Sequence, residues 1–443
     1  MKRILLSVSL LVGGFSFGQT NSYIRCASHN AVEYLASKNP QFMQAYEQTF
    51  QEAKARGKNL SMAKAQYRIP VVVHVVYNNE VENVPDSVIY DQIKVLNEDY
   101  ARLNADSANL RDEFNPLAGI PDIQFVLASR DPQGNPTTGI TRTHTDVSGG
   151  FTDLQGFMQG DMSSLERIKS TADGGEDPWD PTRYMNLWIA NMDMNIGGQS
   201  MTALLGYSTP PPNLPNWPAG STNGMADGVV INYNVVGRNN PNAFSDQGYI
   251  VRGRTATHEV GHYLGLRHIW GDSQDCNSDD GVADTPNATG QSNSDCDTTK
   301  NTCTNDQILV NGDTLDLPDM VENYMDYSAE TCQNTFTKGQ VDLMKGVLEG
   351  PRHDLVYDNE MLLTPTLDQI SANCYPNPTN GSFTMTFNKD AQRVEVLDLN
   401  GKQIMNLENV KTKTTIDLGT MQAGVYLVKF GPQLQNSSKV VKL

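Results

Sequence analysis

The sequence predicts an α/β domain with a histidine-rich helix, followed by a small all-β sandwich at the C-terminal end. Residues 67–77 form a long run of β-branched residues, and the stretch after Pro85 repeats apolar residues every three or four positions. The first pattern is typical of a buried or edge strand, and the second of a helix that packs on a sheet. After residue 372, six short strand-like stretches follow one another within about 70 residues, which indicates a β-sandwich.

Length and charge narrow the class of protein. The chain has 443 residues, more than one ordinary core needs, which suggests two domains. Its formal net charge of −18 and isoelectric point near 4.7 argue against nucleic-acid binding and fit a soluble, secreted protein.

The first residues have the pattern of a secretory signal peptide. Two basic residues precede an apolar run that ends near Val12, and Ser16 and Gly18 place small residues where a signal peptidase reads them. We therefore predict that residues 1–18 are a signal peptide. No later stretch reaches the roughly 18 apolar residues that a membrane-spanning helix needs, so we expect no transmembrane segment. The compartment is expected to be oxidising, so that paired cysteines form disulfides.

The next elements can be placed in chain order. Residues 19–66 are polar and helix-prone, most clearly between Ala31 and Ala55. The strand over residues 67–77 then opens a domain, and its His74 is expected to pack near the sheet rather than in a site. Further strands are predicted over residues 123–128, 186–190 and 228–233. The helix after Pro85 has its apolar face at Ile89, Ile93, Leu96, Tyr100 and Leu103.

One helix, predicted over residues 255–264, carries the residues with the strongest chemical signal. His258 and His262 stand four apart, share one helix face and can bind the same metal ion. Glu259 can act as general base for a water on that metal. Gly265 tolerates the left-handed backbone that lets the chain turn sharply and return His268 as a third ligand. Three protein ligands leave one position for water, as in catalytic rather than structural zinc sites. The alternative is a pair of ordinary histidines on a buried helix.

The rest of the chain completes the two predicted domains. Thr337 and Gln340 form a predicted capping box that begins a helix with apolar Val341, Met344 and Val347. The α/β catalytic unit is predicted to span residues 67–352, and residues 353–371, which lack periodicity, are predicted to be a linker. The C-terminal sandwich over residues 372–443 has predicted strands at 382–387, 393–399, 402–407, 414–418, 425–430 and 439–443, with a hairpin turn at 400–401.

Six cysteines fall into two groups. Four of them, Cys276, Cys296, Cys303 and Cys332, cluster after the histidine motif, and three pairings are possible among them. Cys26 and Cys374 stand apart, in different regions of the chain, and neither has an obvious partner.

The histidine motif, together with the run from Asn323 to Tyr327, resembles the metzincin metallopeptidases. Over residues 67–350 the sequence resembles their pappalysin family, most closely the ulilysin-like members, through the histidine motif, residues 280–286 and residues 332–336. The resemblance implies a metzincin-like catalytic domain with a mixed twisted sheet, a zinc helix and a methionine turn, acting on protein or peptide substrates. Met325 would form the floor beneath the zinc. Tyr327 would donate its hydroxyl to the oxyanion, unless it is simply a packed aromatic residue.

The same resemblance implies further site residues. Glu330 occupies the position of an acidic residue in the S1′ pocket that selects arginine or lysine after the scissile bond. Glutamate is one methylene longer than the aspartate of the family example. A structural calcium ion would be held by Asp280, by Thr285 and by the carbonyl of Val282, with a merely solvated acidic loop as the alternative. The implied disulfides are Cys276–Cys303 and Cys296–Cys332.

Residues 19–66 are interpreted as an inhibitory propeptide. Arg25-Cys26 resembles the cysteine-switch arrangement of ulilysin-like zymogens. The resemblance implies that the thiolate of Cys26 occupies the open zinc position and displaces the water. A disulfide between Cys26 and Cys374 is the alternative.

The C-terminal sandwich resembles the sorting domain of the type IX secretion pathway. The resemblance is carried by residues 375–381, 397–402 and 423–428, in this order. It implies the type IX machinery as a partner and transport across the outer membrane of a diderm bacterium, with release or attachment to the cell surface. A generic binding sandwich is the alternative. For the whole chain we predict a secreted zinc endopeptidase; the alternatives are a metzincin with apolar specificity and a non-catalytic surface-binding protein on a protease scaffold.

Overall fold

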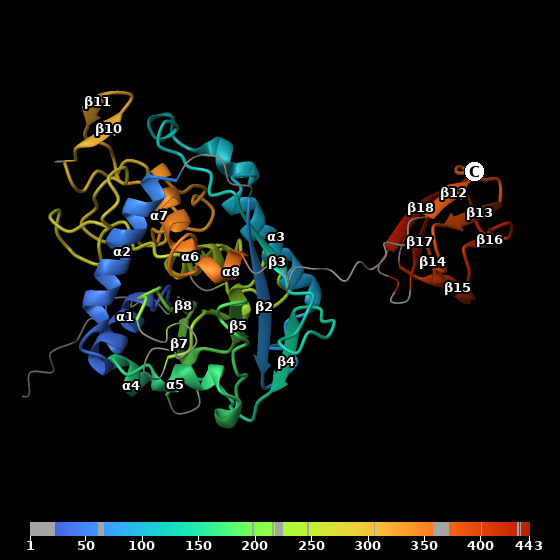
Figure 1. Ribbon diagram of the computed structural model, residues 1–443, viewed down its shortest axis with the longest axis horizontal. Helices are drawn as coiled ribbons and strands as arrows, with labels where there is room; N and C mark the ends of the chain where they lie inside the picture. The colour runs from blue at the N-terminus through green and yellow to red at the C-terminus, as the bar shows by residue number, and fades with distance from the viewer. Residues whose placement is uncertain are drawn as a thin grey trace, which may run out of the picture. The chain divides into compact units, whose positions relative to one another are not determined.

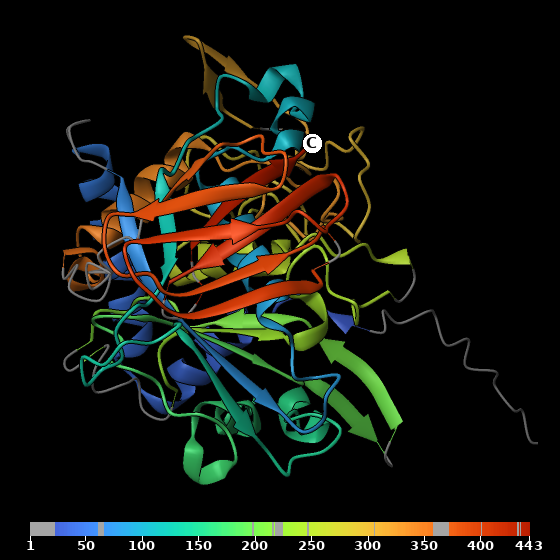
Figure 2. The same cartoon turned by 90° about the vertical axis from the view of Figure 1, so that its right-hand side faces the viewer.

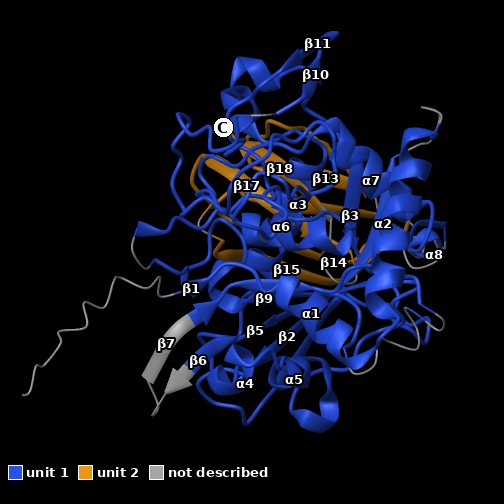
Figure 3. Cartoon of the chain, turned by 90° about the vertical axis from the view of Figure 1, so that its left-hand side faces the viewer, with its two compact units in different colours: residues 1–362 blue, residues 363–443 orange. Residues whose placement is uncertain are grey.

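The computed structural model describes residues 23–60, 66–196, 199–214, 217, 225–245, 248–304, 306–357, 372–399, 401–431, 434 and 436–443. The chain divides into two compact units, Met1–Leu362 and Leu363–Leu443 (Figure 3). The predicted signal peptide lies outside the described residues, as does Asn400 of the predicted hairpin turn. Within the described ranges, no helix is both long and apolar enough to cross a membrane.

A six-stranded mixed sheet forms the centre of the first unit (Figure 1). Its order is β3 (Ile123–Leu127), β2 (Tyr67–Tyr77), β5 (Met185–Ala190), β9 (Val229–Asn232) and β8 (Gly206–Ser208), and β4 (Ile140–His144) pairs with the far half of β2. All these pairs are parallel except β8–β9, which is antiparallel. The strands predicted from the sequence are confirmed within a residue or two. β4 and β8 were missed because β4 is half exposed and β8 has three residues, so neither gives a hydrophobic period.

The sheet is buried on both faces, which explains its nearly continuous apolar strands. On one face Val71, Val73 and Val75 of β2 share a core with helices α3 (Asp86–Tyr100) and α6 (Arg254–Tyr263). On the other face Val76 and Trp188 share a core with α1 (Ser28–Lys38), α4 (Leu154–Met158) and α5 (Ser163–Glu166). The predicted packing of His74 within the sheet is confirmed, because its ring is buried and bonds to Thr141 and Asn186.

Two sequence predictions in this unit are wrong in detail. Leu103 is 75% exposed rather than part of the apolar face of α3, because that helix ends at Tyr100 and Arg102 adopts a left-handed φ of 51°. Residues 353–357 are not linker: they form helix α8 (His353–Tyr357), with Leu355 and Val356 buried. The remaining predicted linker, residues 358–371, lies outside the described part of the chain.

The N-terminal segment packs into the first unit. It forms β1 (Tyr23–Ile24), α1 and α2 (Phe42–Lys58). β1 pairs in parallel with β7 (Gln199–Leu204), which is antiparallel to β6 (Asp193–Ile196). Helix α2 lies along α7 (Lys338–Leu348) (Figure 1). The predicted capping box of α7 is confirmed, since Thr337 Oγ1 accepts from Gln340 N and Gln340 Oε1 accepts from Thr337 N.

Short elements complete the first unit. They are the hairpin of β10 (Ile308–Val310) and β11 (Asp313–Leu315), and the 3₁₀ turns Ala105–Asn109, Asp112–Phe114, Arg167–Lys169, Thr171–Asp173 and Tyr233–Val235.

The second unit is all β (Figure 2). One sheet has the order β12 (Ala372–Tyr375), β13 (Ser382–Phe387), β16 (Lys413–Asp417), and the other β15 (Gln403–Val410), β14 (Gln392–Leu397), β17 (Gly424–Phe430), β18 (Asn436–Lys442). All neighbours are antiparallel. Side chains from both sheets, among them Phe383, Met385 and Val428, share one core, so the predicted sandwich is confirmed. The described strands number seven rather than the six predicted, because β12 lies in a stretch that had been interpreted as sequence before the first strand.

Candidate active site

Helix α6 and the turn after it bring three histidines together. All ten residues of α6 are buried, and His258 and His262 project from it one turn apart. Gly265 has the predicted left-handed backbone, with a φ of 91°, and Leu266 N donates to Gly261 O at 2.9 Å. This turn ends the helix and carries His268 back to the other two rings.

The Nε2 atoms of the three histidines form a nearly equilateral triangle. His262 Nε2 lies 3.1 Å from His258 Nε2 and 3.0 Å from His268 Nε2, and the remaining side of the triangle is 3.2 Å. Imidazole nitrogens bound to one tetrahedral zinc at about 2.0–2.1 Å would lie about 3.3 Å apart. The triangle therefore has the size that a shared zinc ion requires.

The other ring nitrogens are held by acceptors. His258 Nδ1 lies 2.7 Å from Tyr324 O, and His262 Nδ1 lies 2.9 Å from Leu266 O. Each Nδ1 thus carries the proton, and each Nε2 directs its lone pair at the centre of the triangle. Burial, reinforced by repulsion from His268, lowers the pKa of His262 to about 3, and burial also lowers the pKa of His258 well below its usual value. The rings of His258 and His262 are therefore neutral, the form that binds metal.

Glu259 lies beside this triangle. Its side chain is fully buried, and burial raises its pKa to about 8. The carboxylate needs the open space at Gly206, because an added Cβ there would lie 2.8 Å from Cγ of Glu259. The structure thus places a potential proton acceptor directly next to the candidate metal ligands.

The methionine turn lies beneath the histidines. Met325 is fully buried, and its Sδ packs so closely on Gly261 that an added Cβ there would lie 2.4 Å from the sulfur. Two residues on, Tyr327 packs its ring against those of His258 and His268, with centroid distances of 5.6 and 4.9 Å. The structure therefore packs Met325 against the helix that carries His258 and His262, and Tyr327 against two of the three histidine rings.

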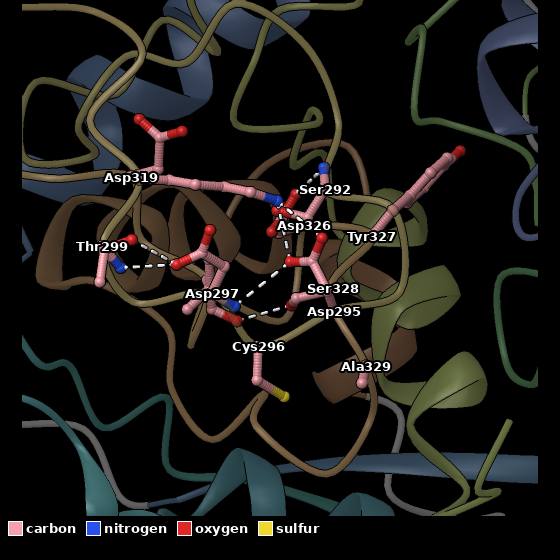
Figure 4. Close-up of polar contacts among 12 residues, drawn as sticks. Ser292, Asp295, Cys296, Asp297, Thr299, Asp319, Asp326, Tyr327, Ser328 and Ala329 are labelled. Carbon is pink, nitrogen blue, oxygen red and sulfur yellow. Dashed lines mark hydrogen bonds and ion pairs between the residues drawn. The ribbon is translucent and has the colours of Figure 1, made fainter. Parts of the chain in front are cut away.

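The loop before the methionine turn holds the backbone around Tyr327 (Figure 4). Ser292 N donates to Asp326 Oδ1 at 3.2 Å, and Ser294 N donates to Tyr327 O at 3.0 Å. Ala329 N in turn donates to Asp295 O at 3.1 Å. The two disulfides of this region, Cys276–Cys303 and Cys296–Cys332, have the pairing that the resemblance implied.

The N-terminal segment occupies the space above the histidines. Cys26 is buried, and its Sγ belongs to a four-residue cluster with the three histidines whose ligand atoms all lie within 4.8 Å of one another. Burial, followed by the charge of Glu259, raises the pKa of this thiol well above its usual value; a cation among the histidines would act in the opposite direction. Cys26 and Cys374 are each a free cysteine in the described part of the chain.

The same segment also contacts Glu259 and Tyr327. Ser28 Oγ donates to Glu259 Oε2 at 2.7 Å, and Cys26 Sγ lies 3.4 Å from the same oxygen. The hydroxyl of Tyr327 donates to the carbonyl of Cys26 at 3.2 Å. Thus the base, the tyrosine and the candidate metal ligands are all occupied by adjacent residues of one segment.

Arg25 fills a pocket next to the histidines. Its Nη1 donates to the carbonyl of Tyr327 at 2.8 Å and also to that of Ser328, and its guanidinium lies 5.4 Å from the ring centroid of Tyr249. Burial lowers the pKa of Arg25, but the charges around it, including that of Glu330, outweigh this effect and raise it overall. The arginine side chain is therefore held in an electronegative pocket.

Glu330 is a buried residue next to this pocket. It is 1% exposed and accepts hydrogen bonds from the Tyr249 hydroxyl at 3.0 Å, Thr255 N at 2.7 Å and Thr255 Oγ1 at 2.8 Å, as well as from Arg252 N. These bonds fix the carboxylate at the start of the zinc helix. Its charge reaches Arg25 through space, while the carbonyls of Tyr327 and Ser328 make the direct contacts.

The candidate calcium residues converge in the loop after the zinc helix. Asp280 Oδ1 lies 2.8 Å from Thr285 Oγ1, which also lies 2.8 Å from the carbonyl of Val282. Asp280 is 1% exposed, and burial raises its pKa to about 8. Three oxygens of the kind that calcium prefers thus meet at one buried point.

Sequence reasoning missed three polar contacts of the site. Ser28 bonds to Glu259, and His29 lies 3.3 Å from Asp272 through its Nδ1. Asp272 Oδ1 lies 2.6 Å from His268 Nδ1. The position of Asp272, four residues after the third histidine, was the one local signal; nothing in the sequence marked the other two.

Two family models match the sequence. Residues 169–349 match the family described as pregnancy-associated plasma protein-A, and residues 373–442 match the secretion system C-terminal sorting domain. Relatives in fungi include an extracellular metalloprotease of Arthroderma benhamiae, 27% identical over 304 residues, which are 67% of this chain and 84% of the relative. One of Verticillium alfalfae is 28% identical over 294 residues, 66% of this chain and 78% of the relative.

Solved structures of mirolysin are more similar. Mature mirolysin of Tannerella forsythia, in complex with a cleaved peptide, is 40% identical with a TM-score of 0.55; the match covers 67% of this chain and 98% of that one. A promirolysin mutant of the same organism is 38% identical with a TM-score of 0.59, and this match covers 76% of this chain and 98% of that one.

Proposed function

Because this chain belongs to the pregnancy-associated plasma protein-A family and is a zinc metalloendopeptidase exported by type IX secretion, we propose that it is made as a latent precursor and cuts before arginine or lysine. The precursor would consist of a propeptide up to residue 66, a catalytic domain over residues 67–352 and a sorting domain over residues 372–443. The observation that carries this proposal is the occupation of the site by Arg25, Cys26 and Ser28.

The three histidines would hold zinc, which supplies the Lewis acid that polarises the scissile carbonyl and acidifies the attacking water. Glu259 takes the proton from that water and passes it to the leaving amine. Tyr327 donates its hydroxyl to the carbonyl oxygen as negative charge develops there. Its 3.2 Å hydrogen bond to the carbonyl of Cys26 supports this role, because the hydroxyl already donates to a peptide carbonyl beside the three histidines.

The test of the catalytic proposal is Glu259→Ala in the full chain. Proteolysis of casein should be abolished while zinc content stays that of the wild type, because the change removes the base and no ligand. Near-normal activity would contradict the mechanism. Wild-type protein without activity on casein or gelatin, even after maturation, would favour the alternative of a non-catalytic binding protein.

Specificity is proposed to reside in the pocket that Arg25 fills. A guanidinium there already finds two carbonyl acceptors, the ring of Tyr249 and the charge of Glu330. A peptide library should therefore give arginine or lysine at P1′, and Glu330→Gln should weaken that preference. Glu330→Asp is the matched control, because it keeps the charge. Apolar residues at P1′ would refute the assignment in favour of a metzincin with apolar specificity.

Latency is proposed to depend on Cys26 as the zymogen switch. A thiolate on the fourth zinc position leaves no place for the attacking water. The greater share of this chain that promirolysin covers, compared with mature mirolysin, supports a precursor of this kind. Cys26→Ala precursor should become active earlier than the wild type, with Cys374→Ala as the control. A Cys26→Ala precursor that matures as slowly as the wild type would exclude Cys26 as the switch.

Self-cleavage before a basic residue would release the segment. Four candidates lie near its end: Arg56, Lys58, Lys64 and Arg68. Arg56 and Lys58 belong to α2 and Arg68 to β2, and a protease cuts extended chain more readily than regular structure. Lys64 lies outside the described residues. The N-terminal residue of the matured enzyme, read by sequencing, would show which of the four sites is cut.

A calcium ion is proposed at Asp280, Thr285 and the carbonyl of Val282. A divalent cation would keep the buried carboxylate of Asp280 ionised, against the burial that raises its pKa to about 8. Calcium should raise the unfolding temperature of the wild type, whereas Asp280→Asn should lose most of this response. Asp279→Asn, an exposed neighbour, is the control.

Sorting is proposed to depend on residues 372–443. Deletion of this range should leave the catalytic unit folded but retained in the periplasm. Export of the truncated protein at the wild-type level would reject this role.

A further inference from the structure

Asp272 is brought to the zinc site by an unusual turn. Gly271 and Asp272 are both left-handed, with φ values of 61° and 53°, and Gly271 N donates to His268 O at 2.9 Å. Aspartate is among the few non-glycine residues that adopt this conformation readily. The turn folds the chain back, so that the carboxylate of Asp272 lies against the ring that precedes it by four residues.

The carboxylate contacts the metal-binding ring directly. Asp272 Oδ1 lies 2.6 Å from His268 Nδ1, and the indole of Trp270 stacks on the same imidazole with a centroid distance of 4.3 Å. The ring of His268 is therefore held at its edge by one residue and on its face by the other. His258 and His262, in contrast, rest on backbone carbonyls.

We propose that Asp272 is a positioning residue for zinc, and that in the precursor its second oxygen anchors the N-terminal segment through His29. A carboxylate that accepts the Nδ1 proton fixes the tautomer with a free Nε2 lone pair and makes that nitrogen a stronger ligand. The second half of the proposal rests on the proposed latency; the first half does not.

The second oxygen of Asp272 faces the N-terminal segment. Asp272 Oδ2 lies 3.3 Å from His29 Nδ1, and His29 Nε2 lies 3.4 Å from Glu33 Oε1 one turn along α1. Asp272 and His29 also line the same cleft of about 350 Å³, next to Cys26. Removal of the segment would therefore free Oδ2 into the cleft and leave His268 as the hydrogen-bond partner of this carboxylate.

The zinc half is tested with Asp272→Asn in the full chain. We expect the zinc dissociation constant, measured by competition with a chromophoric chelator, to rise roughly 10- to 100-fold. The unfolding temperature of the zinc-free protein should not change, because the contact matters through the metal. Asp275→Asn, an exposed residue of the same loop, is the control and should bind zinc like the wild type.

Two outcomes would overturn this half. Wild-type zinc affinity in Asp272→Asn would show that the carboxylate does not support the ligand. A fall in the unfolding temperature of the zinc-free variant, in step with its loss of affinity, would show that Asp272 merely holds the turn. Both results are independent of latency. Latency itself is tested separately, by the activity of the freshly purified wild-type precursor.

The anchoring half is tested with His29→Ala. We expect this precursor to mature a few-fold faster than the wild type, while the matured enzymes, which have the same residues after cleavage, bind zinc equally. A precursor with the wild-type maturation time would overturn the anchoring role. If the wild-type precursor is active from the start, the proposed latency is wrong and so is the anchoring role of His29. The zinc measurement would still test the role of Asp272 at the metal site.

Discussion

The contact between helices α2 and α7 offers a direct test of what keeps the N-terminal segment in place. Gly57 of α2 lies so close to α7 that an added Cβ would be 1.8 Å from the carbonyl oxygen of Asp342. That is roughly 1.5–2 Å short of ordinary van der Waals contact. The obstacle is a backbone carbonyl, which no side-chain rotation can relieve, so Gly57→Ala must push the two helices apart.

The expected size of the effect follows from two opposing terms. Overpacking costs about 1–3 kcal/mol, whereas alanine stabilises a helix by about 1 kcal/mol relative to glycine. Because the obstacle is a backbone carbonyl, the upper end of the overpacking range applies, and we expect Gly57→Ala to weaken docking of the segment by about 2 kcal/mol, a factor of roughly 30 in the ratio of closed to open precursor. The lag before activity appears, followed with a fluorogenic peptide, should shorten accordingly.

Controls on both helices make this prediction sharp. Gln51→Ala changes an exposed position of α2 and should keep the wild-type lag. Gly346→Ala places a Cβ 1.9 Å from the carbonyl of Ala53 and should act like Gly57→Ala in the precursor, yet leave the matured enzyme active. If Gly57→Ala and Gln51→Ala precursors show the same lag, docking of α2 does not maintain latency and the reasoning fails.

Three further predictions concern the site itself. Tyr327→Phe should lower kcat by about 10²–10³-fold with little change in KM, the loss expected for one oxyanion donor; a change confined to KM would argue for a binding role. Gly206→Ala should reduce kcat at least about tenfold, because it displaces Glu259, and unchanged zinc content with unchanged kcat would contradict this. The contact with Asp272 raises the pKa of His29. The contribution of His29 to docking is therefore full below the pKa of a free histidine, about 6.5, and is lost as the pH rises through the raised pKa. The His29→Ala precursor should therefore mature faster than the wild type at pH 6 and equally fast at pH 9, and a ratio of lags that does not vary with pH would count against it.

Sequence reasoning was most successful where the information is local. The metal triad lies within eleven residues, and its geometry follows from helix periodicity and from one left-handed glycine, Gly265. The strands of the C-terminal sandwich are likewise predicted by short runs in which apolar and polar residues alternate. The contact of Asp272 with His268 was partly predictable, because the two residues stand four apart. It also requires a left-handed backbone at Asp272, which no sequence pattern indicates.

Contacts between distant parts of the chain could not be derived from periodicity. Ser28 and Glu259 are separated by 231 residues, and Arg25 and Tyr327 by 302. Whether such pairs meet depends on how β1 pairs with β7 and how α2 packs on α7, which is decided by the whole fold. The same holds for the end of α3: Leu103 continues the helical period in the sequence, but the backbone leaves the helix at Arg102.

The arrangement of the N-terminal segment indicates that other residues add to the hold that Cys26 is proposed to have on the site. Neighbouring residues would block different requirements of catalysis: Arg25 fills the proposed specificity pocket, Cys26 lies beside the three histidines, and Ser28 bonds to Glu259, the proposed base. The segment is also held by β1, which pairs with β7, and by α2, which packs on α7. When one of these elements is docked, the effective concentration of the other contacts rises. A single substitution removes one of these contacts and leaves the others in place. We therefore expect the proposed block to end completely only after the chain between α2 and β2 is cut, because the segment can then leave the catalytic unit with all these contacts at once.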